Sequence, residues 1–317
     1  MSKSQHWSKI EERGSLLGMQ ILFLIYKLLG RYPLRTVLFP VVLYLYFSGK
    51  PARKVSKQFL QQVSLATGKN HLKWYSGFKH FWTFADAAFD KVDAWLGRIT
   101  HERVRYNDES IMEKISSSGK GAVFIGSHLG NLEVCRALSH GRYATKINVL
   151  VFTEHAVKFN ALLKQVTPEV DVDLIQVSSI GPDTAIALKT KVDNGEIVVI
   201  VGDRTSASVT GRVTNTDFLG KPAPFSQGPF ILASVLECPL YFLFCLKEPQ
   251  GFLVHFEHIS DQIKLPRKQR AEILDNLITR YAKLLESFAK AYPYQWFNFY
   301  DFWQSDNASK NTSEVGK

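Results

Sequence analysis

Cysteine is scarce in this chain, and apolar runs long enough to cross a membrane without tilt are lacking. The three cysteines, Cys135, Cys238 and Cys245, are an odd number without zinc-type spacing. They therefore indicate neither a disulfide framework nor a structural metal, and a reducing cytoplasm is their simplest setting. Internal repeats and Pro- or Gly-rich linkers are also lacking, which argues against a string of separate modules.

Positive charge and aromatic residues are abundant. The chain has 39 Lys and Arg against 29 Asp and Glu, a formal net charge of +10, and 13% aromatic residues. Such an excess is typical of proteins that meet nucleic acid, an anionic membrane or an acidic partner. The basic residues are scattered without a recognition motif, so we expect no nucleic acid as a partner. Aromatic residues and leucines gather near the N-terminus, which favours an anionic membrane surface.

Two apolar runs, residues 16–29 and 34–47, are separated by residues 30–33, Gly-Arg-Tyr-Pro, which predict a break. Each run is shorter than the ~20 residues of an untilted membrane span. The apolar stretch begins late and no cleavage site follows it, which argues against a cleavable signal peptide. Both flanks are basic, so the positive-inside rule places both in the cytoplasm. This predicts a hairpin or in-plane helices, with a kinked span and a buried helical pair as alternatives. The basic side chains expected to reach lipid head groups are Lys27, Arg31 and Arg35.

The pattern beyond the apolar runs predicts an α/β fold, a mixed, largely parallel sheet flanked by helices, with an N-terminal helical membrane-associated segment. The expected strands are 121–126, 147–152, 172–176, 197–201, 240–246 and 252–257. The expected helices are 108–117, 131–140, 156–165, 182–193, 228–237 and an amphipathic 267–290, after two helices within 51–98. We therefore expect a membrane-associated segment over 1–50, one catalytic domain over 51–304 and a disordered tail over 305–317.

The most informative stretch is residues 122–133, Ala-Val-Phe-Ile-Gly-Ser-His-Leu-Gly-Asn-Leu-Glu. Its apolar run predicts a buried strand that delivers His128 at its carboxyl end, where ligands of open α/β sheets bind. Glu133, on the first turn of the next helix, can reach back to one ring nitrogen and stabilise the imidazolium. The pair suits general-base catalysis on a hydroxyl. A structural histidine beside a surface glutamate is the alternative.

Residues around this pair suggest further roles. Gly130 lets the backbone approach a ligand closely, and free amides at the helix start could bind a developing oxyanion. Asp203 and Arg204 follow the strand 197–201 and could position an acceptor, with the guanidinium on a phosphate. An internal ion pair that anchors the loop is the alternative for these two residues.

Residues 127–133 resemble the first motif block of the lysophospholipid acyltransferase superfamily, in the form used by the late acyltransferases of lipid A. Residues 202–204, Gly-Asp-Arg, resemble the third block, and residues 238–240, Cys-Pro-Leu, resemble the Pro-containing fourth block. The aromatic ending, residues 293–303, is similar to that of a branch of predicted bacterial acyltransferases found with aryl polyene lipid biosynthesis. The resemblance covers about residues 10–304.

The resemblance implies an HX4E O-acyltransferase on the cytoplasmic face of a bacterial inner membrane. It would move an acyl chain from a thioester on acyl carrier protein, or from acyl-CoA, to a hydroxyl of a membrane lipid or glycolipid. His128 and Glu133 would be catalytic, without a metal or cofactor. The expected substrate-binding residues are Ser127, Gly130, Asn131, Asp203, Arg204 and, from a loose match to the second block, Asn160. A thioesterase or lipid hydrolase and a non-catalytic lipid-binding protein are the alternatives.

Overall fold

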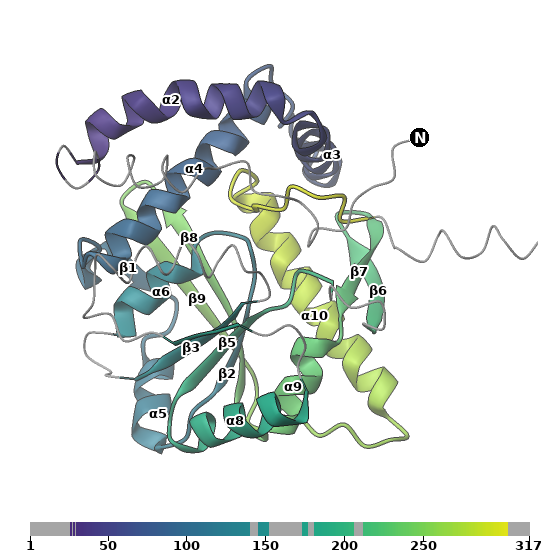
Figure 1. The fold of residues 1–317 in the computed structure, drawn as a ribbon. Helices are drawn as coiled ribbons and strands as arrows, with labels where there is room; N and C mark the ends of the chain where they lie inside the picture. The colour runs from purple at the N-terminus through teal and green to yellow at the C-terminus, as the bar shows by residue number, and fades with distance from the viewer. Residues whose placement is uncertain are drawn as a thin grey trace, which may run out of the picture.

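A computed structural model describes residues 30–139, 145–151, 173–176, 181–205 and 212–303, together with Tyr26 and Leu28. Its main sheet has seven strands in the order β1-β9-β8-β2-β5-β3-β4 (Figure 1). All neighbouring strands pair in parallel except β8 and β9, which are antiparallel. The predicted mixed, largely parallel sheet is confirmed. The strands are β1 Val104–Tyr106, β2 Val123–Gly126, β3 Ile147–Val151, β4 Asp173–Gln176, β5 Ile197–Val201, β8 Leu240–Glu248 and β9 Gly251–Ser260.

Helices cover both faces of this sheet (Figure 1). One face packs against α8, α9, α10 and a two-stranded hairpin, and the other against α4, α5 and α6. The helices are α2 Arg31–Ser48, α3 Lys50–Thr67, α4 Ser76–Trp95, α5 Ser110–Ser118, α6 Leu132–Ser139, α8 Pro182–Asp193, α9 Gly228–Leu236 and α10 Arg270–Ala291, with a short 3-10 turn at His101–Arg103. The hairpin strands are β6 Val213–Phe218 and β7 Lys221–Ser226.

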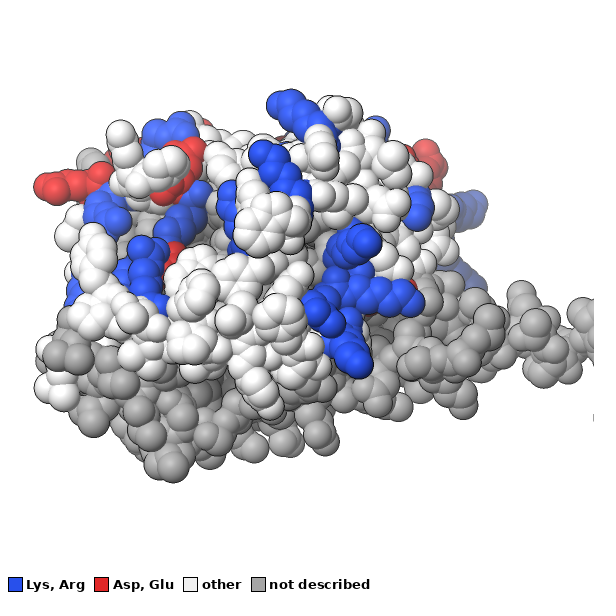
Figure 2. Space-filling view, turned by 90° about the horizontal axis from the view of Figure 1, so that it is seen from above, with Lys and Arg blue, Asp and Glu red and all other residues white. Residues whose placement is uncertain are grey.

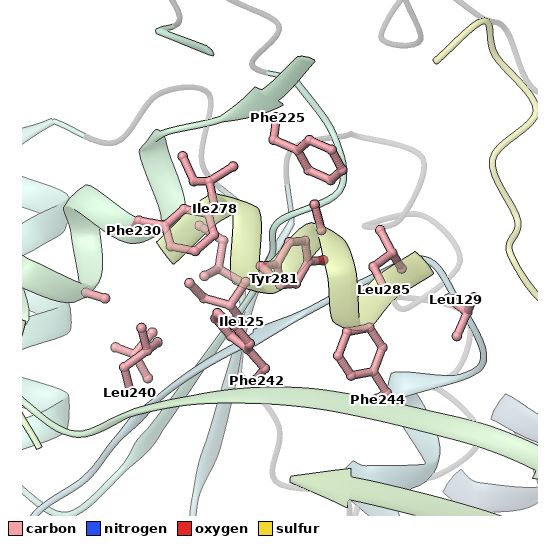
Figure 3. Close-up of a cluster of buried hydrophobic side chains, with 14 of the residues drawn as sticks. Ile125, Leu129, Phe225, Phe230, Leu240, Phe242, Phe244, Ile278, Tyr281 and Leu285 are labelled. Carbon is pink, nitrogen blue, oxygen red and sulfur yellow. The ribbon is translucent and has the colours of Figure 1, made fainter. Parts of the chain in front are cut away.

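The core divides at the sheet because successive side chains of a strand point to opposite faces. In β2, Ile125 belongs to the cluster under α9 and α10, whereas Phe124 belongs to the cluster under α5. Tyr281 of α10 stands in the middle of the first cluster (Figure 3), and its hydroxyl donates to the carbonyl of Gly126, 2.7 Å away. The last residue of β2 is therefore held from the α10 side.

The β6–β7 hairpin and the short strand β1 are elements of the described fold that the sequence did not predict. The second strand of the hairpin, Lys221–Ser226, contains two prolines, which cannot donate to a sheet ladder and argue against a central strand. Among the described residues no further strand lies beside the hairpin, which packs on α10, where Thr214 donates to Asp275 across 2.9 Å. The expected helix 156–165 and the expected tail 305–317 lie outside the described residues.

The predicted break at residues 30–33 is confirmed only at Gly30, whose φ is +79°, because residues 31–33 already belong to α2. The expectation that Arg31 and Arg35 reach lipid head groups is wrong, and Lys27 lies outside the described residues. Arg31 lies 2.7 Å from Asp90, and Arg35 lies 2.9 Å from Asp86. Both aspartates belong to α4, which runs beside α2. No helix within the described ranges is both long and apolar enough for a membrane span.

An ion cluster joins α2, α4 and β8. Asp86, Asp90 and Asp93 stand at spacings of four and three residues, so they share one side of α4. Lys247 of β8 lies 2.7 Å from both Asp86 and Asp90. Although burial raises the pKa of Asp86, Lys247 and Arg31 hold it far below its usual value. Arg31, Arg35 and Lys247 therefore compensate these buried carboxylates, which explains why the arginines turn inward.

Candidate active site

His128 and Asp203 meet because β2 and β5 are neighbours. Gly126 at the end of β2 pairs with Val201 at the end of β5, and each reactive residue lies two positions further along. The amide of Gly202 donates to the carbonyl of Gly126 across 2.9 Å, which extends the pairing by one step. The two side chains therefore emerge together at the carboxyl ends of parallel strands, where open α/β sheets bind ligands.

The carboxylate of Asp203 is buried and accepts three hydrogen bonds. Its Oδ1 lies 2.8 Å from Nδ1 of His128. Its Oδ2 accepts from the amide of His128 at 2.8 Å and from the indole of Trp296 at 2.9 Å. The side chain of Asp203 is fully buried, whereas that of His128 is 27% exposed. An ionised carboxylate can only accept, so Nδ1 carries a proton and Nε2 presents its lone pair.

The charges around this pair favour a neutral imidazole. Burial lowers the pKa of His128, the nearby Arg204 lowers it further, and Asp203 opposes both by raising it. Burial raises the pKa of Asp203, but the charge and hydrogen bonds of His128 and the indole of Trp296 bring it below its usual value. At neutral pH the pair is therefore an uncharged histidine beside a carboxylate, which is the protonation state of a general base.

The C-terminal segment holds the histidine loop in place. The amide of Gly130 donates to the carbonyl of Gln295 across 2.8 Å, and the amide of Phe297 donates to the carbonyl of His128 across 3.0 Å. Between these bonds, Trp296 forms a β-bridge with Leu129 and is almost fully buried. Sequence analysis found the aromatic ending but not its contact with Asp203, because nothing in the local spacing indicates that contact.

The backbone amides of the histidine loop are all engaged within the protein. Those of residues 128–131 donate in turn to Asp203, the hydroxyl of Ser127, Gln295 and Cys245. These four amides precede α6, which begins at Leu132, so the expected oxyanion site on amides at the helix start stays a prediction. Gly130 also approaches the strand β8 closely. A Cβ there would lie 1.9 Å from the carbonyl oxygen of Cys245.

The other predicted residues of the first motif have local partners. Ser127 and Asn131 are buried. The amide nitrogen of Asn131 donates to the carbonyl of Ala87 in α4 across 3.0 Å, and its oxygen accepts from the amide of Glu133 at 3.2 Å. Asn131 thus caps α6 and ties it to α4. Glu133 lies on the first turn of α6, as predicted, and is half-buried. Its contact with His128 stays a prediction.

Arg204 is half-buried beside the site, with its guanidinium carbon 5.9 Å from the centre of the Tyr300 ring. The hydroxyl of Tyr300 donates to the backbone carbonyl of Asp203 across 3.3 Å, so the aromatic ending encloses this loop as well. The role of Arg204 as a phosphate-binding residue stays a prediction. Asn160 lies outside the described residues.

A second histidine supports the C-terminal segment from behind. His80 of α4 is fully buried, with Nδ1 2.9 Å from the hydroxyl of Ser56 and Nε2 2.9 Å from the carbonyl of Trp296. The carbonyl can only accept, so Nε2 carries the proton. Burial lowers the pKa of His80 to about 4, against a small opposing effect of the bond to Trp296. His80 therefore links α3 and α4 to the residue that holds Asp203.

Residues 82–305 match the family model described as bacterial lipid A biosynthesis acyltransferase. The matched region includes His128, Asp203 and Trp296, and it begins within α4, so that α2 and α3 precede it. No curated protein matches the chain.

Proposed function

Because the chain belongs to the bacterial lipid A biosynthesis acyltransferase family, we propose that it moves an acyl chain from a thioester donor to a hydroxyl of a lipid or glycolipid, with His128 as general base. The observation that carries this proposal is the 2.8 Å contact between Nδ1 of His128 and the buried carboxylate of Asp203. That contact fixes the ring proton on Nδ1, so the lone pair of Nε2 is available on a partly exposed side chain.

In the proposed step, Nε2 of His128 takes the proton of the acceptor hydroxyl as its oxygen attacks the thioester carbonyl. The C–S bond then breaks, and the leaving thiolate takes the proton back from the imidazolium. The products are one ester and one thiol, so the enzyme returns to its starting state without a covalent intermediate. General-base assistance of this kind contributes about 10²–10⁴ in rate.

Two carboxylates have different proposed roles. We assign Asp203 as the positioning residue that fixes the tautomer of His128, with Trp296 in turn fixing Asp203. We keep Glu133, on the first turn of α6, as the second carboxylate of the site. Arg204 is proposed to bind a phosphate, either of the acceptor or of the phosphopantetheine arm of the donor. The remaining residues proposed to contact substrate are Ser127, Gly130, Asn131 and Asn160.

The donor is proposed to be acyl carrier protein rather than acyl-CoA. Acidic carriers suit a chain with a net charge of +10, because complementary charge speeds encounter and favours the right partner. The same excess suits an anionic bilayer that presents the acceptor lipid. We therefore propose that the protein acts on the cytoplasmic face of a bacterial inner membrane.

The test is transfer by the purified protein, with acyl carrier protein thioesters and acyl-CoA as donors and a membrane lipid extract as acceptor. Mass spectrometry should detect a new acylated lipid with wild-type protein. His128→Ala should lower its formation at least a hundredfold, while His101→Ala, at an exposed histidine elsewhere, should not. Free fatty acid without acylated lipid would instead indicate a hydrolase, and no turnover of either donor would indicate a non-catalytic protein.

A further inference from the structure

The outer side of helix α2 carries no charge. The inner side is buried through Leu34, Leu38 and Val42. The only charged residues of the helix, Arg31 and Arg35, bind aspartates of α4. Surface helices of soluble proteins usually present charged or polar side chains to water. Here the exposed large apolar side chains are Tyr32, Val37, Phe39, Val41, Tyr44 and Phe47.

A stripe of positive charge follows directly on α3. Lys50, Arg53, Lys54 and Lys57 stand at positions i, i+3, i+4 and i+7, so they share one side of the helix. The three lysines are exposed, and the guanidinium carbon of Arg53 lies 5.3 Å from the centre of the Tyr46 ring. Helix α3 contains no acidic residue. Like charges at these spacings repel weakly, and an anionic partner would relieve that repulsion.

These two features lie at the same end of the molecule. Only Gly49 separates α2 from α3, and α2 lies across the top of the molecule in Figure 1. Figure 2 looks down on this side and shows Lys and Arg side chains gathered next to a wide uncharged area. We call the exposed apolar side chains of α2 and the basic stripe of α3 together the α2–α3 face.

We infer that the α2–α3 face docks on an anionic lipid bilayer, with α2 lying in the plane of the interface. Aromatic and apolar side chains beside lysines are the pattern of interfacial helices, whose apolar side enters the head-group region. The helix is fastened to α4 at both ends, by Arg31 on Asp90 and by Tyr46 on Phe81, whose rings lie 5.2 Å apart. Only its outer side is thus left for the bilayer.

The inference rests on the proposed function, since a lipid acceptor must reach the base from the membrane. Helix α4 lies between the α2–α3 face and the histidine loop, because it contacts α2 on one side and receives the hydrogen bond of Asn131 at Ala87 on another. The catalytic loop is therefore one helix away from the proposed docking face.

Co-sedimentation with vesicles tests the apolar part of the face. Wild-type protein should bind vesicles that contain phosphatidylglycerol more tightly than vesicles of phosphatidylcholine alone. The double variant Val41→Glu/Tyr44→Glu should lose at least about tenfold in affinity for the former. The matched control is Ile186→Glu/Val235→Glu, which adds the same charge at exposed apolar side chains of α8 and α9 and should bind as wild type does.

A second pair of variants tests the basic stripe. Replacing Lys50, Lys54 and Lys57 with Gln should lower affinity for phosphatidylglycerol vesicles about a hundredfold, since each lysine near an anionic surface contributes about fivefold. The control removes the same charge from the exposed segment before α10, through Lys264→Gln, Arg267→Gln and Lys268→Gln. The control should change affinity much less.

Equal losses of vesicle affinity in the test and control variants would overturn the inference. Failure of the wild-type protein to bind phosphatidylglycerol vesicles would overturn it as well. Concentration-dependent self-association that Val41→Glu/Tyr44→Glu abolishes, with vesicle binding kept, would mean that a second copy covers this face. Failure of the proposed function has a different signature. In that case wild-type protein would bind vesicles through this face and still form no acylated lipid.

Discussion

Replacing Asp203 with Asn tests how the candidate base is activated. The substitution keeps the shape of the side chain, and one oxygen can still accept from the amide of His128 and the indole of Trp296. The new amide nitrogen then faces Nδ1 of His128, 2.8 Å away, and donates to it. Nδ1 must accept, so the ring proton moves to Nε2, the atom that is proposed to take the proton of the acceptor.

The size of the effect follows from this tautomer change. In other enzymes whose histidine depends on a carboxylate, the same exchange lowers kcat about 10⁴-fold, which corresponds to about 5 kcal/mol in the activation free energy. Stability should change far less. A hydrogen bond to a charged group is worth about 1.5–3 kcal/mol, and the substitution also removes the cost of a buried charge. Asp203→Asn should therefore fold and bind substrate while losing turnover.

The assay is steady-state transfer, with kcat and KM measured separately across pH. We expect kcat to fall at least a thousandfold while KM stays close to that of the wild type. Asp90→Asn is the control, because Asp90 is equally buried but contacts Arg31 and Lys247 instead. It should lower stability and keep kcat. Glu133→Gln tests the second carboxylate in the same assay. A larger fall in kcat for Glu133→Gln than for Asp203→Asn would mean that Glu133, and not Asp203, positions His128. A folded Asp203→Asn protein with kcat within about threefold of wild type would refute the reasoning.

Three further predictions concern the groups that support the site. Trp296→Phe should lower kcat about tenfold at similar KM by removing one donor from a carboxylate; Trp303→Phe, whose indole donates to a backbone carbonyl, should not. His80 has a pKa of about 4 when folded and about 6.5 when unfolded, so the unfolded chain binds the proton first as pH falls. The free energy of unfolding should therefore drop by up to about 3 kcal/mol between pH 6.5 and 4, and denaturant titrations of His80→Gln should lack this drop. Gly130→Ala should destabilise by more than about 2 kcal/mol in the same titrations, because its Cβ meets β8 at a φ of +79°.

Most strands of the main sheet and the place of His128 at a strand end were predictable because both depend on local sequence. Buried apolar runs such as 197–201 end at residues that emerge from the sheet, and His128 stands two residues beyond such a run. The partner of His128 was not predictable in this way. Glu133 is the near carboxylate in sequence, whereas Asp203 is 75 residues away and meets the ring only because β5 lies beside β2. One signal was present, since His128 and Asp203 both stand two residues beyond a buried strand.

The inward turn of Arg31 and Arg35 shows a second limit. Within α2 alone, an arginine among apolar residues suggests a side chain that reaches toward lipid head groups. The deciding residues lie on another helix, where Asp86 and Asp90 form part of an acidic stripe. Two helices with opposite charges at helical spacing would have predicted the pairing. Strand β7 was not predicted for a different reason, because its prolines argue against a central strand, whereas β7 pairs with β6 alone.

The measurement that tests the central claim most directly is formation of an acylated lipid from an acyl carrier protein thioester by purified wild-type and His128→Ala protein. We predict a mass increase of one acyl chain on a lipid hydroxyl with the wild type and at least a hundredfold less product with the variant. Product formation by folded His128→Ala at the wild-type rate would contradict the account.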